Sequence, residues 1–474
     1  MARAPGPSAA PLGSFLRDFP APLGPGEPLP WSSAGSGALS RAEVPGALAE
    51  RARSLLGGRG VSPLLEASLI HAAVDEVLQT DLTEFKLQNV ETEGEGDEER
   101  FTLLDGESLQ RCFFNKLRDI CSEWHKQLPS LRPLERFLLV SIHAIRNTRR
   151  KMEDRHVLLP EFNQLFGLSD DVDRAYFAVF DGHGGVDAAN YSATHLHVNV
   201  GLHEEIVKNP AEALKCSFQK TDEMFLFKAK REKLRSGTTG VSALIVGNKL
   251  HIAWLGDSQV MLVQQGKAVT LMEPHKPERE DERARIETLG GCVTYMDCWR
   301  VNGTLAVSRA IGNVVRFLEA CNTNQSVNSA MSARKIRDYN SCCVFGMDQY
   351  WMSKKKILLF ACYSIGILKL ISGNSSSHPD YRTSETFLSL YFLVPADCFQ
   401  TFALFRVGEK LSDFLHLLSS LSLTPAGQAD RLVTEHVPRL VGPSVSVILQ
   451  GLLWKVMSVL CLCSGKLDLC DYSG

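Results

Sequence analysis

The feature that most restricts the fold is a series of four short runs, between residues 136 and 256, that are rich in β-branched and aromatic residues. They read RFLLVSIHAI, RAYFAVF, GVSALIV and KLHIAWLG, and each has the length of a typical strand. The last two are joined through GNK, which is a turn sequence suited to a β-hairpin. Because strands joined by hairpins pair antiparallel, we expect antiparallel sheets rather than a parallel sheet of βαβ units.

Helical segments alternate with these strands. The spacing of apolar residues predicts helices over residues 185–208, 210–235 and 277–291. The third segment ends in Gly290-Gly291, a pair suited to a left-handed helix terminus. The sequence therefore predicts an α+β fold of packed antiparallel sheets flanked by helices.

The part of the chain before these strands has two regions of different composition. Residues 1–60 are rich in Ala, Gly, Pro and Leu and have little periodicity, so we expect a mostly disordered N-terminal region. Residues 61–136 are predicted to be helical, with helices from Pro63 to about Glu84 and from Leu103 to Leu128. The acidic run ETEGEGDEER between them is interpreted as a solvated loop, and a site for a basic partner is the alternative.

The pattern changes again after Gly312. Residues 313–474 have no sustained periodicity and contain eight of the thirteen cysteines, so we expect a divergent, poorly ordered tail. This tail has two long apolar segments. KKKILLFACYSIGILKLI is shorter than the roughly twenty apolar residues that span a bilayer, and GPSVSVILQGLLWKVMSVLCLCSG is interrupted by Gln450 and Lys455. We therefore expect no membrane span.

Composition restricts the partners and the compartment. With 22% charged residues and a net charge of -3, the chain has no basic field of the kind that attracts nucleic acid. The start, MARAPGPSAAPLGSF, lacks the apolar core of a signal peptide, and the cysteines form no CxxC pair. We expect free thiols and an intracellular, cytoplasmic location.

One cluster of residues suited to catalysis is Asp181-Gly182-His183-Gly184-Gly185, which follows a predicted strand and precedes a predicted helix. An Asp at the end of a buried strand can project its carboxylate into a cleft, and Gly182 can bring a carbonyl close to a cation because it has no Cβ. His183 could donate a proton near neutral pH. The alternative, which the sequence leaves open, is a tight turn in which Asp181 caps the following helix.

A second cluster lies in RRKMEDRH. An extended chain would place Arg149, Lys151, Glu153 and Arg155 on one face. Carboxylate oxygens suit Mg²⁺ or Mn²⁺, and a guanidinium group binds phosphate through two hydrogen bonds. The cluster thus predicts a cation and a phosphate held side by side, and the alternative is a solvated, salt-bridged strand face.

Together the two clusters resemble the metal-dependent serine/threonine phosphatases of the protein phosphatase 2C (PPM) family. Three further segments agree with that family in order and spacing: SGTTGVSALIVGNKLHIAWLGDSQVMLV, EPHKPEREDERARIETLGG and RVNGTLAVSRAIG. The resemblance runs from about Ser141 to Gly312. It implies a partial phosphatase domain over residues 137–312, built as a β-sandwich of two antiparallel sheets flanked by helices, and hydrolysis of phosphoserine and phosphothreonine by a metal-activated water.

The N-terminal segments FLRDFP, LPW, LQTDLTEF and FFNKLRDI resemble one branch of this family, the calcium/calmodulin-dependent kinase phosphatases. That resemblance implies phosphorylated proteins as substrates, with calmodulin-dependent or p21-activated kinases among them. It also implies PIX exchange factors as partners.

The resemblance assigns roles to individual residues and implies Mg²⁺ or Mn²⁺ as cofactor, with two ions in the site. Arg149 corresponds to the arginine that binds the substrate phosphate, and His183 to the proposed general acid. The metal ligands are Glu153, the bridging Asp181, the carbonyl of Gly182 and, for a third and weaker site, Asp257 in GDSQ. The SGTT segment, Ser236 to Thr239, is expected to be structural.

The chain departs from the family pattern after AVSRAIG. Asn313 stands where the family has Asp, Tyr363-Ser364 stand where its later Asp-Gly would be, Asp348 is not followed by Gly, and the tail has no Asp-Asn pair. We therefore expect a doubtful second metal site. We also expect an incomplete sandwich with open sheet edges, because the C-terminal strands are replaced. The alternative function is a catalytically impaired pseudophosphatase that acts as a protein-binding module.

Overall fold

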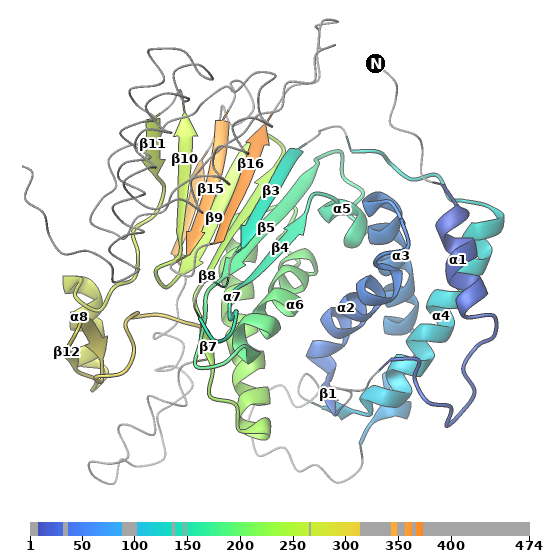
Figure 1. Ribbon diagram of the computed structural model, residues 1–474, viewed down its shortest axis with the longest axis horizontal. Helices are drawn as coiled ribbons and strands as arrows, with labels where there is room; N and C mark the ends of the chain where they lie inside the picture. Colours follow the sequence, from blue (N-terminus) through green and yellow to red (C-terminus); the bar gives the residue numbers. More distant parts are fainter. Residues whose placement is uncertain are drawn as a thin grey trace, which may run out of the picture. The chain divides into compact units, whose positions relative to one another are not determined.

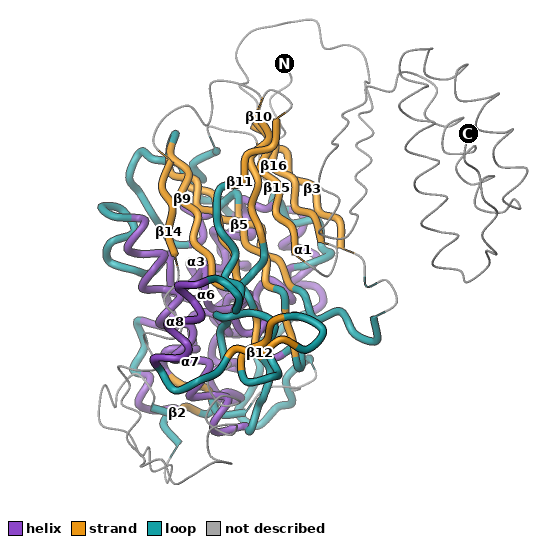
Figure 2. The backbone as a smooth tube through the Cα atoms, turned by 90° about the vertical axis from the view of Figure 1, so that its left-hand side faces the viewer, coloured by secondary structure: helices purple, strands orange, loops and turns teal. Residues whose placement is uncertain are grey.

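A computed structural model describes residues 8–31, 37–87, 102–134, 138–144, 146, 149–264, 267–312, 343–347, 356–362 and 366–372. All of them lie in one compact unit, Met1–Ser376, shown in Figures 1 and 2. A second unit, Ser377–Gly474, lies outside the described residues.

Two five-stranded antiparallel sheets form the centre of this unit (Figure 1). The first has the order β14-β9-β8-β5-β4, from strands Cys343–Met347, Lys249–Leu255, Gly240–Val246, Arg174–Phe180 and Arg155–Leu159. The second has the order β11-β10-β15-β16-β3, from strands Lys267–Thr270, Gln259–Gln264, Lys356–Cys362, Gly366–Ser372 and Leu138–Ala144. The four strands predicted from the sequence are β3, β5, β8 and β9, and Gly247, with a φ of +54°, makes the hairpin turn between the last two.

Strand β5 shows why the two sheets form a sandwich. Every residue of RAYFAVF is buried, so both faces of this strand are covered. Phe177 and Val179 pack with Val260 and Leu262 of β10 in a core between the sheets. Tyr176, Ala178 and Phe180 point the other way, into a core shared with the helices. The predicted α+β architecture of packed antiparallel sheets is confirmed.

Helices cover the outer face of the first sheet (Figure 1). They are α5 (Phe162–Leu165), α6 (Asp187–Gly201) and α7 (Pro210–Glu232). The predicted helix over residues 185–208 therefore ends earlier, at Gly201, whereas the one over 210–235 is confirmed as α7. Two short strands, β6 (Gly182–His183) and β7 (Gly237–Thr238), pair beside them, and α8 (Glu280–Thr288) precedes the hairpin of β12 (Val293–Tyr295) and β13 (Trp299–Val301).

The N-terminal region is more ordered than its composition predicts. The predicted helices of residues 61–136 correspond to α3 (Pro63–Leu78) and α4 (Gly106–Lys126), and short elements lie between or beside them: β1 (Leu39–Ser40), β2 (Leu103–Leu104), η1 (Arg41–Glu43) and η2 (Leu82–Phe85). Residues 1–60, however, contain α1 (Ala10–Asp18) and α2 (Val44–Leu56), so the expected disorder is wrong there. Short helices are stabilised mainly by packing, which composition does not reveal: Phe15 of α1 is fully buried and lies 6.3 Å from Phe114, ring centre to ring centre.

The expectation of open sheet edges is also wrong. Strands β15 and β16, from the region assigned to the tail, lie between β10 and β3, with Phe360 opposite Val260 and Leu368 opposite Ile142. Strand β14 pairs along β9, with Phe345 opposite Ile252. These tail segments are rich in Ile, Leu and Phe, which favour strands, and their pairing provides backbone partners for β10, β3 and β9 that would otherwise be missing.

Two sequence expectations, on membrane-spanning segments and on cysteines, can be compared with the described part of the chain. None of its helices combines the length and the apolar character that crossing a bilayer requires. Five cysteines within it are free thiols: Cys112, Cys121, Cys216, Cys292 and Cys298. The eight cysteines of the tail lie in strands β14 and β15 or outside the described residues.

Candidate functional site

The register of β4 against β5 brings the two predicted clusters to one end of the first sheet. Arg155, the first residue of β4, lies opposite Phe180, the last residue of β5. Since the strands are antiparallel, Glu153 and Asp181-Gly182 continue past the same end. A Cβ on Gly182 would lie 2.5 Å from the carbonyl oxygen of Glu153, closer than real Cβ contacts. Gly182 is therefore required for the close approach of the two segments.

Asp181 is fixed through its backbone rather than as a helix cap. Its N–H donates to Oγ1 of Thr239 (3.3 Å), and its carbonyl accepts from the N–H of Thr239 (2.9 Å). Helix α6 begins after Val186 without a side-chain cap, and the N–H of Ala188 donates to Oγ of Ser236 (3.0 Å). The N-cap residue of this helix is therefore Val186 rather than Asp181, and Ser236 accepts from its first turn.

His183 lies in the short strand β6, two residues beyond Asp181. It pairs with Gly237 of β7, and Gly182 pairs with Thr238. The side chain of His183 is partly exposed, as is that of Asp181. Two glycines with positive φ, Gly184 (+70°) and Gly185 (+134°), then turn the chain into α6. The turn therefore places Asp181, Gly182 and His183 together beside Glu153.

The RRKMEDRH cluster does not form the extended face predicted from its alternating charges. Arg150 and Lys151 lie in a bend, and β4 begins only at Arg155. The guanidinium group of Arg155 donates to Oδ1 of Asn190 on α6 (2.5 Å) and to the carbonyls of Met152 (3.1 Å) and Asp154 (2.7 Å). Arg155 is therefore occupied in holding the Glu153 segment against α6, a role that its spacing in the sequence does not reveal.

Arg149 is the first residue of this cluster. Its side chain is exposed, and its N–H donates to the carbonyl of Arg146 (3.3 Å). An exposed guanidinium group can reach an incoming anion without displacing a buried partner.

Thr239 links the Asp181 turn to the turn that carries Asp257. Its Oγ1 lies 2.6 Å from Oγ of Ser258, and both residues are buried. A Cβ on Gly256 would lie 2.6 Å from Cβ of Thr239, and Gly256 has a φ of +92°. The sequence predicts a structural role for the SGTT segment. Its connection of the two aspartate turns leaves no signal in the sequence, because adjacent buried positions have no periodicity.

The carboxylate of Asp257 is buried and has a cationic partner. Its Oδ2 lies 2.5 Å from Nζ of Lys276, and its side chain is 8% exposed. The backbone beside it is also held: the N–H of His275 donates to the carbonyl of Gly256 (2.9 Å), and the N–H of Gly256 donates to Nδ1 of His275 (3.1 Å). Burial, and then the charge of Arg309, lower the pKa of His275 to about 3, so its ring is neutral and accepts this hydrogen bond.

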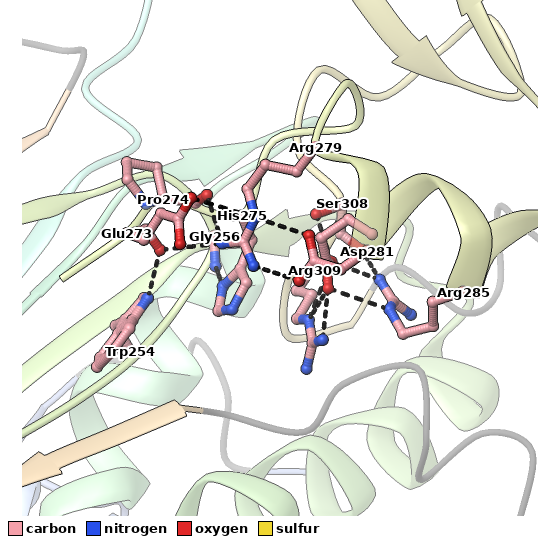
Figure 3. Close-up of polar contacts among 11 residues, drawn as sticks. Trp254, Gly256, Glu273, Pro274, His275, Arg279, Asp281, Arg285, Ser308 and Arg309 are labelled. Carbon is pink, nitrogen blue, oxygen red and sulfur yellow. Dashed lines mark hydrogen bonds and ion pairs between the residues drawn. The ribbon is translucent and has the colours of Figure 1, made fainter.

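A buried ionic cluster lies next to this turn (Figure 3). Glu282 of α8 is fully buried and accepts hydrogen bonds from Nη2 of Arg309 (2.5 Å), Nη2 of Arg285 (2.7 Å) and Oγ of Ser308 (2.6 Å). Burial alone would raise the pKa of Glu282, but the hydrogen bonds from Arg309, Arg285 and Ser308 outweigh it and hold this pKa well below its usual value. The N–H of Ser308 also donates to the carbonyl of His275 (3.1 Å), so the cluster is connected to the Asp257 turn.

Among the described residues, those at the end of β4 and β5 suit a divalent cation, whereas those around Asp257 do not. Glu153 and Asp181-Gly182 lie past the same end of β4 and β5, and carboxylate and carbonyl oxygens are the ligands that Mg²⁺ or Mn²⁺ prefers. Asp257 does not fit as it stands, because Lys276 already neutralises it. Within the part of the chain that the structure describes, no group of three or more His, Cys, Asp or Glu side chains is arranged to hold a metal ion.

Comparison with known proteins gives the family of the chain. The sequence matches the family described as Protein phosphatase 2C over residues 138–339. Protein phosphatase 1F of Homo sapiens is 61% identical over 310 residues, which cover 64% of this chain and 68% of that protein. Protein phosphatase 1E of Homo sapiens is 50% identical over 294 residues, 62% of this chain and 38% of that protein.

Among solved structures, the one titled "Structure of a C.elegans sex determining protein" aligns with a TM-score of 0.53 at 20% identity. The alignment covers 75% of this chain and 80% of that chain, and at this identity it supports the fold alone. The family resemblance of the sequence motifs is confirmed by the sequence matches. The chain therefore belongs to the protein phosphatase 2C family of protein serine/threonine phosphatases, which are hydrolases.

Proposed function

We propose that this chain hydrolyses phosphoserine and phosphothreonine in proteins at the end of β4 and β5, where Glu153, Asp181 and Gly182 meet. The observation that carries the proposal is the approach of the Gly182 backbone to the carbonyl of Glu153, because it joins two clusters that lie about thirty residues apart in sequence. Glu153, Asp181 and the carbonyl of Gly182 would hold Mg²⁺ or Mn²⁺. When bound, such an ion supplies a nucleophile at neutral pH by lowering the pKa of water.

The side chains of this chain have distinct roles in the proposed reaction. The exposed guanidinium of Arg149 binds the phosphate group of the substrate through paired hydrogen bonds and offsets charge on its oxygens. His183 donates a proton to the Ser or Thr oxygen as the P–O bond breaks, so that the alcohol leaves neutral. The products are inorganic phosphate and the dephosphorylated protein, and no phosphoenzyme is formed.

The proposal extends to substrates and partners only through resemblance. Phosphoproteins are the substrate class, with calmodulin-dependent or p21-activated kinases as candidates and PIX exchange factors as candidate partners. The N-terminal helices that carry the branch-specific segments are ordered: Trp31 of LPW donates from Nε1 to Oε1 of Gln110 on α4 (3.1 Å). A cytoplasmic location stays a prediction from the sequence.

A second candidate function is that of a pseudophosphatase that binds phosphoproteins without turnover. It is favoured by the absence, in the described ranges, of a three-residue metal-binding group. Tyr363 and Ser364, which lie outside the described residues, replace the Asp-Gly of the family pattern. They follow β15, whose Ala361 lies opposite Gln259, two residues after Asp257.

An assay of Mn²⁺-dependent hydrolysis distinguishes the two functions. The full chain is compared with Asp181→Asn on an aryl phosphate and on a phosphothreonine peptide. Turnover above that of Asp181→Asn supports the phosphatase, and equal rates support the pseudophosphatase. In the latter case the double substitution Tyr363→Asp and Ser364→Gly should produce turnover, because it restores a carboxylate after β15. If it does not, the loss of that carboxylate is not the cause of inactivity.

A further inference from the structure

The starting observation is the ion pair between Asp257 and Lys276. Nζ of Lys276 lies 2.5 Å from Oδ2 of Asp257. The carboxylate is almost completely buried, whereas the lysine side chain is 27% exposed, so its stem reaches inward from the surface. A buried carboxylate is stable only when it is paired and hydrogen-bonded, and Lys276 supplies both the charge and the donor.

Backbone hydrogen bonds hold the two segments that carry the pair close together, so the pair does not depend on a chance rotamer of a long side chain. The residues that precede the two partners, Gly256 and His275, exchange hydrogen bonds in both directions, at 2.9 Å and 3.1 Å. On the other side of Lys276, its carbonyl accepts from the N–H of Arg279 (3.2 Å). The Lys276 stem is therefore anchored on the same side of Asp257 in the folded chain.

A divalent cation and this ammonium group compete for the same carboxylate. Two cations at hydrogen-bond distance from one buried oxygen pair repel each other strongly in a low-dielectric environment. Binding of a metal ion at Asp257 thus requires the ammonium group to move into solvent, which its partial exposure permits.

We propose that Lys276 is the resident cation of the Asp257 site, so that Asp257 binds a divalent cation only when Lys276 is displaced or neutralised. The site would then be closed to Mg²⁺ and Mn²⁺ in the resting chain. This inference concerns cation binding alone and does not depend on whether the chain hydrolyses a phosphoester.

The test is a Mn²⁺ titration of the full chain, with free Mn²⁺ followed by electron paramagnetic resonance. Lys276→Gln removes the charge and should add one bound Mn²⁺ per chain, or tighten the weakest site at least about tenfold. Lys276→Arg keeps the charge and should match the wild type. The double variant Lys276→Gln with Asp257→Asn should lose the added site, because the carboxylate that binds the ion is gone.

Two results would overturn the proposal. One is an unchanged isotherm for Lys276→Gln in a variant whose circular dichroism spectrum matches the wild type. The other comes from Asp257→Asn alone, which should leave the wild-type isotherm unchanged if Asp257 is closed. Loss of one bound Mn²⁺ in this variant would mean that the wild-type chain already uses Asp257. This second measurement stands even if Lys276→Gln does not fold.

Discussion

Replacing Glu282 by Gln should destabilise the protein by about 3 kcal/mol. The carboxylate is fully buried and accepts from Arg309, Arg285 and Ser308. Leaving a buried charge without its partner typically costs about 3–5 kcal/mol. Gln keeps the shape and one acceptor, worth about 1 kcal/mol, and the two arginine side chains, 12% and 16% exposed, recover some hydration. The lower part of the range is therefore expected.

The measurement is urea and thermal unfolding of the full chain, followed by circular dichroism and tryptophan fluorescence. A loss of about 3 kcal/mol corresponds to a decrease in Tm of roughly 4–6 °C for a folded unit of this size, from an unfolding entropy of about 2.1 cal/mol/K per residue. Because the pKa of Glu282 is lowered in the folded state despite burial, its ionised form contributes stability above the unfolded carboxyl pKa, near pH 4. That contribution is lost as the pH falls through the folded pKa, so the variant should show a weaker acid dependence.

The matched control lies on the same helix. Glu287→Gln removes an exposed carboxylate whose partner is Arg283, at 3.0 Å, and such surface pairs contribute about 0–1 kcal/mol. If Glu282→Gln shifts the unfolding free energy no more than this control does, then the buried cluster stabilises the fold no more than a surface ion pair.

Three further outcomes follow from the packing. Phe114→Ala should cost about 3–5 kcal/mol in urea unfolding, because its ring is fully buried among other aromatic rings of the N-terminal helices; a cost below about 1 kcal/mol would contradict that packing. Gly182→Ala should push the Glu153 segment away and weaken Mn²⁺ binding at least about tenfold, whereas Gly37→Ala, in open space, should not. Burial lowers the pKa of His195 to about 3, so its contribution to stability should fall by about 1.4 kcal/mol per pH unit as the pH drops from about 6.5 toward 3. The free energy of unfolding of His195→Gln should therefore decrease less between pH 6 and pH 4 than that of the wild type. An equal decrease in the two proteins would refute this assignment.

The sequence predicted the elements whose pattern is local. Strands β5 and β8 and helix α7 follow from runs of apolar residues with a clear period, and Gly247 marks the hairpin. The meeting of Glu153 with Gly182 was predictable only through family resemblance, since it depends on the register between β4 and β5. Register is set by long-range pairing and leaves no local signal.

Features that depend on distant partners were missed. Helix α1 is stabilised by Phe114, which is about a hundred residues away, and its own composition resembles a linker. The alternating charges in RRKMEDRH predicted a strand face, but the chain bends at Arg150. The guanidinium group of Arg155 donates a hydrogen bond to a backbone carbonyl instead. The Lys276–Asp257 pair crosses nineteen positions, and nothing near either residue in the sequence indicates it.

The insertion of β15 and β16 between β10 and β3 has a consequence for synthesis on the ribosome. Strand β3 ends at Ala144, and its partner β16 begins only at Gly366, so this edge must wait for more than two hundred further residues. Until then the nascent chain presents the unpaired edges of β3 and β10, which favour association with other chains. The second sheet is therefore the last part of the fold that can close, and the period before its closure is when a chaperone would be most needed.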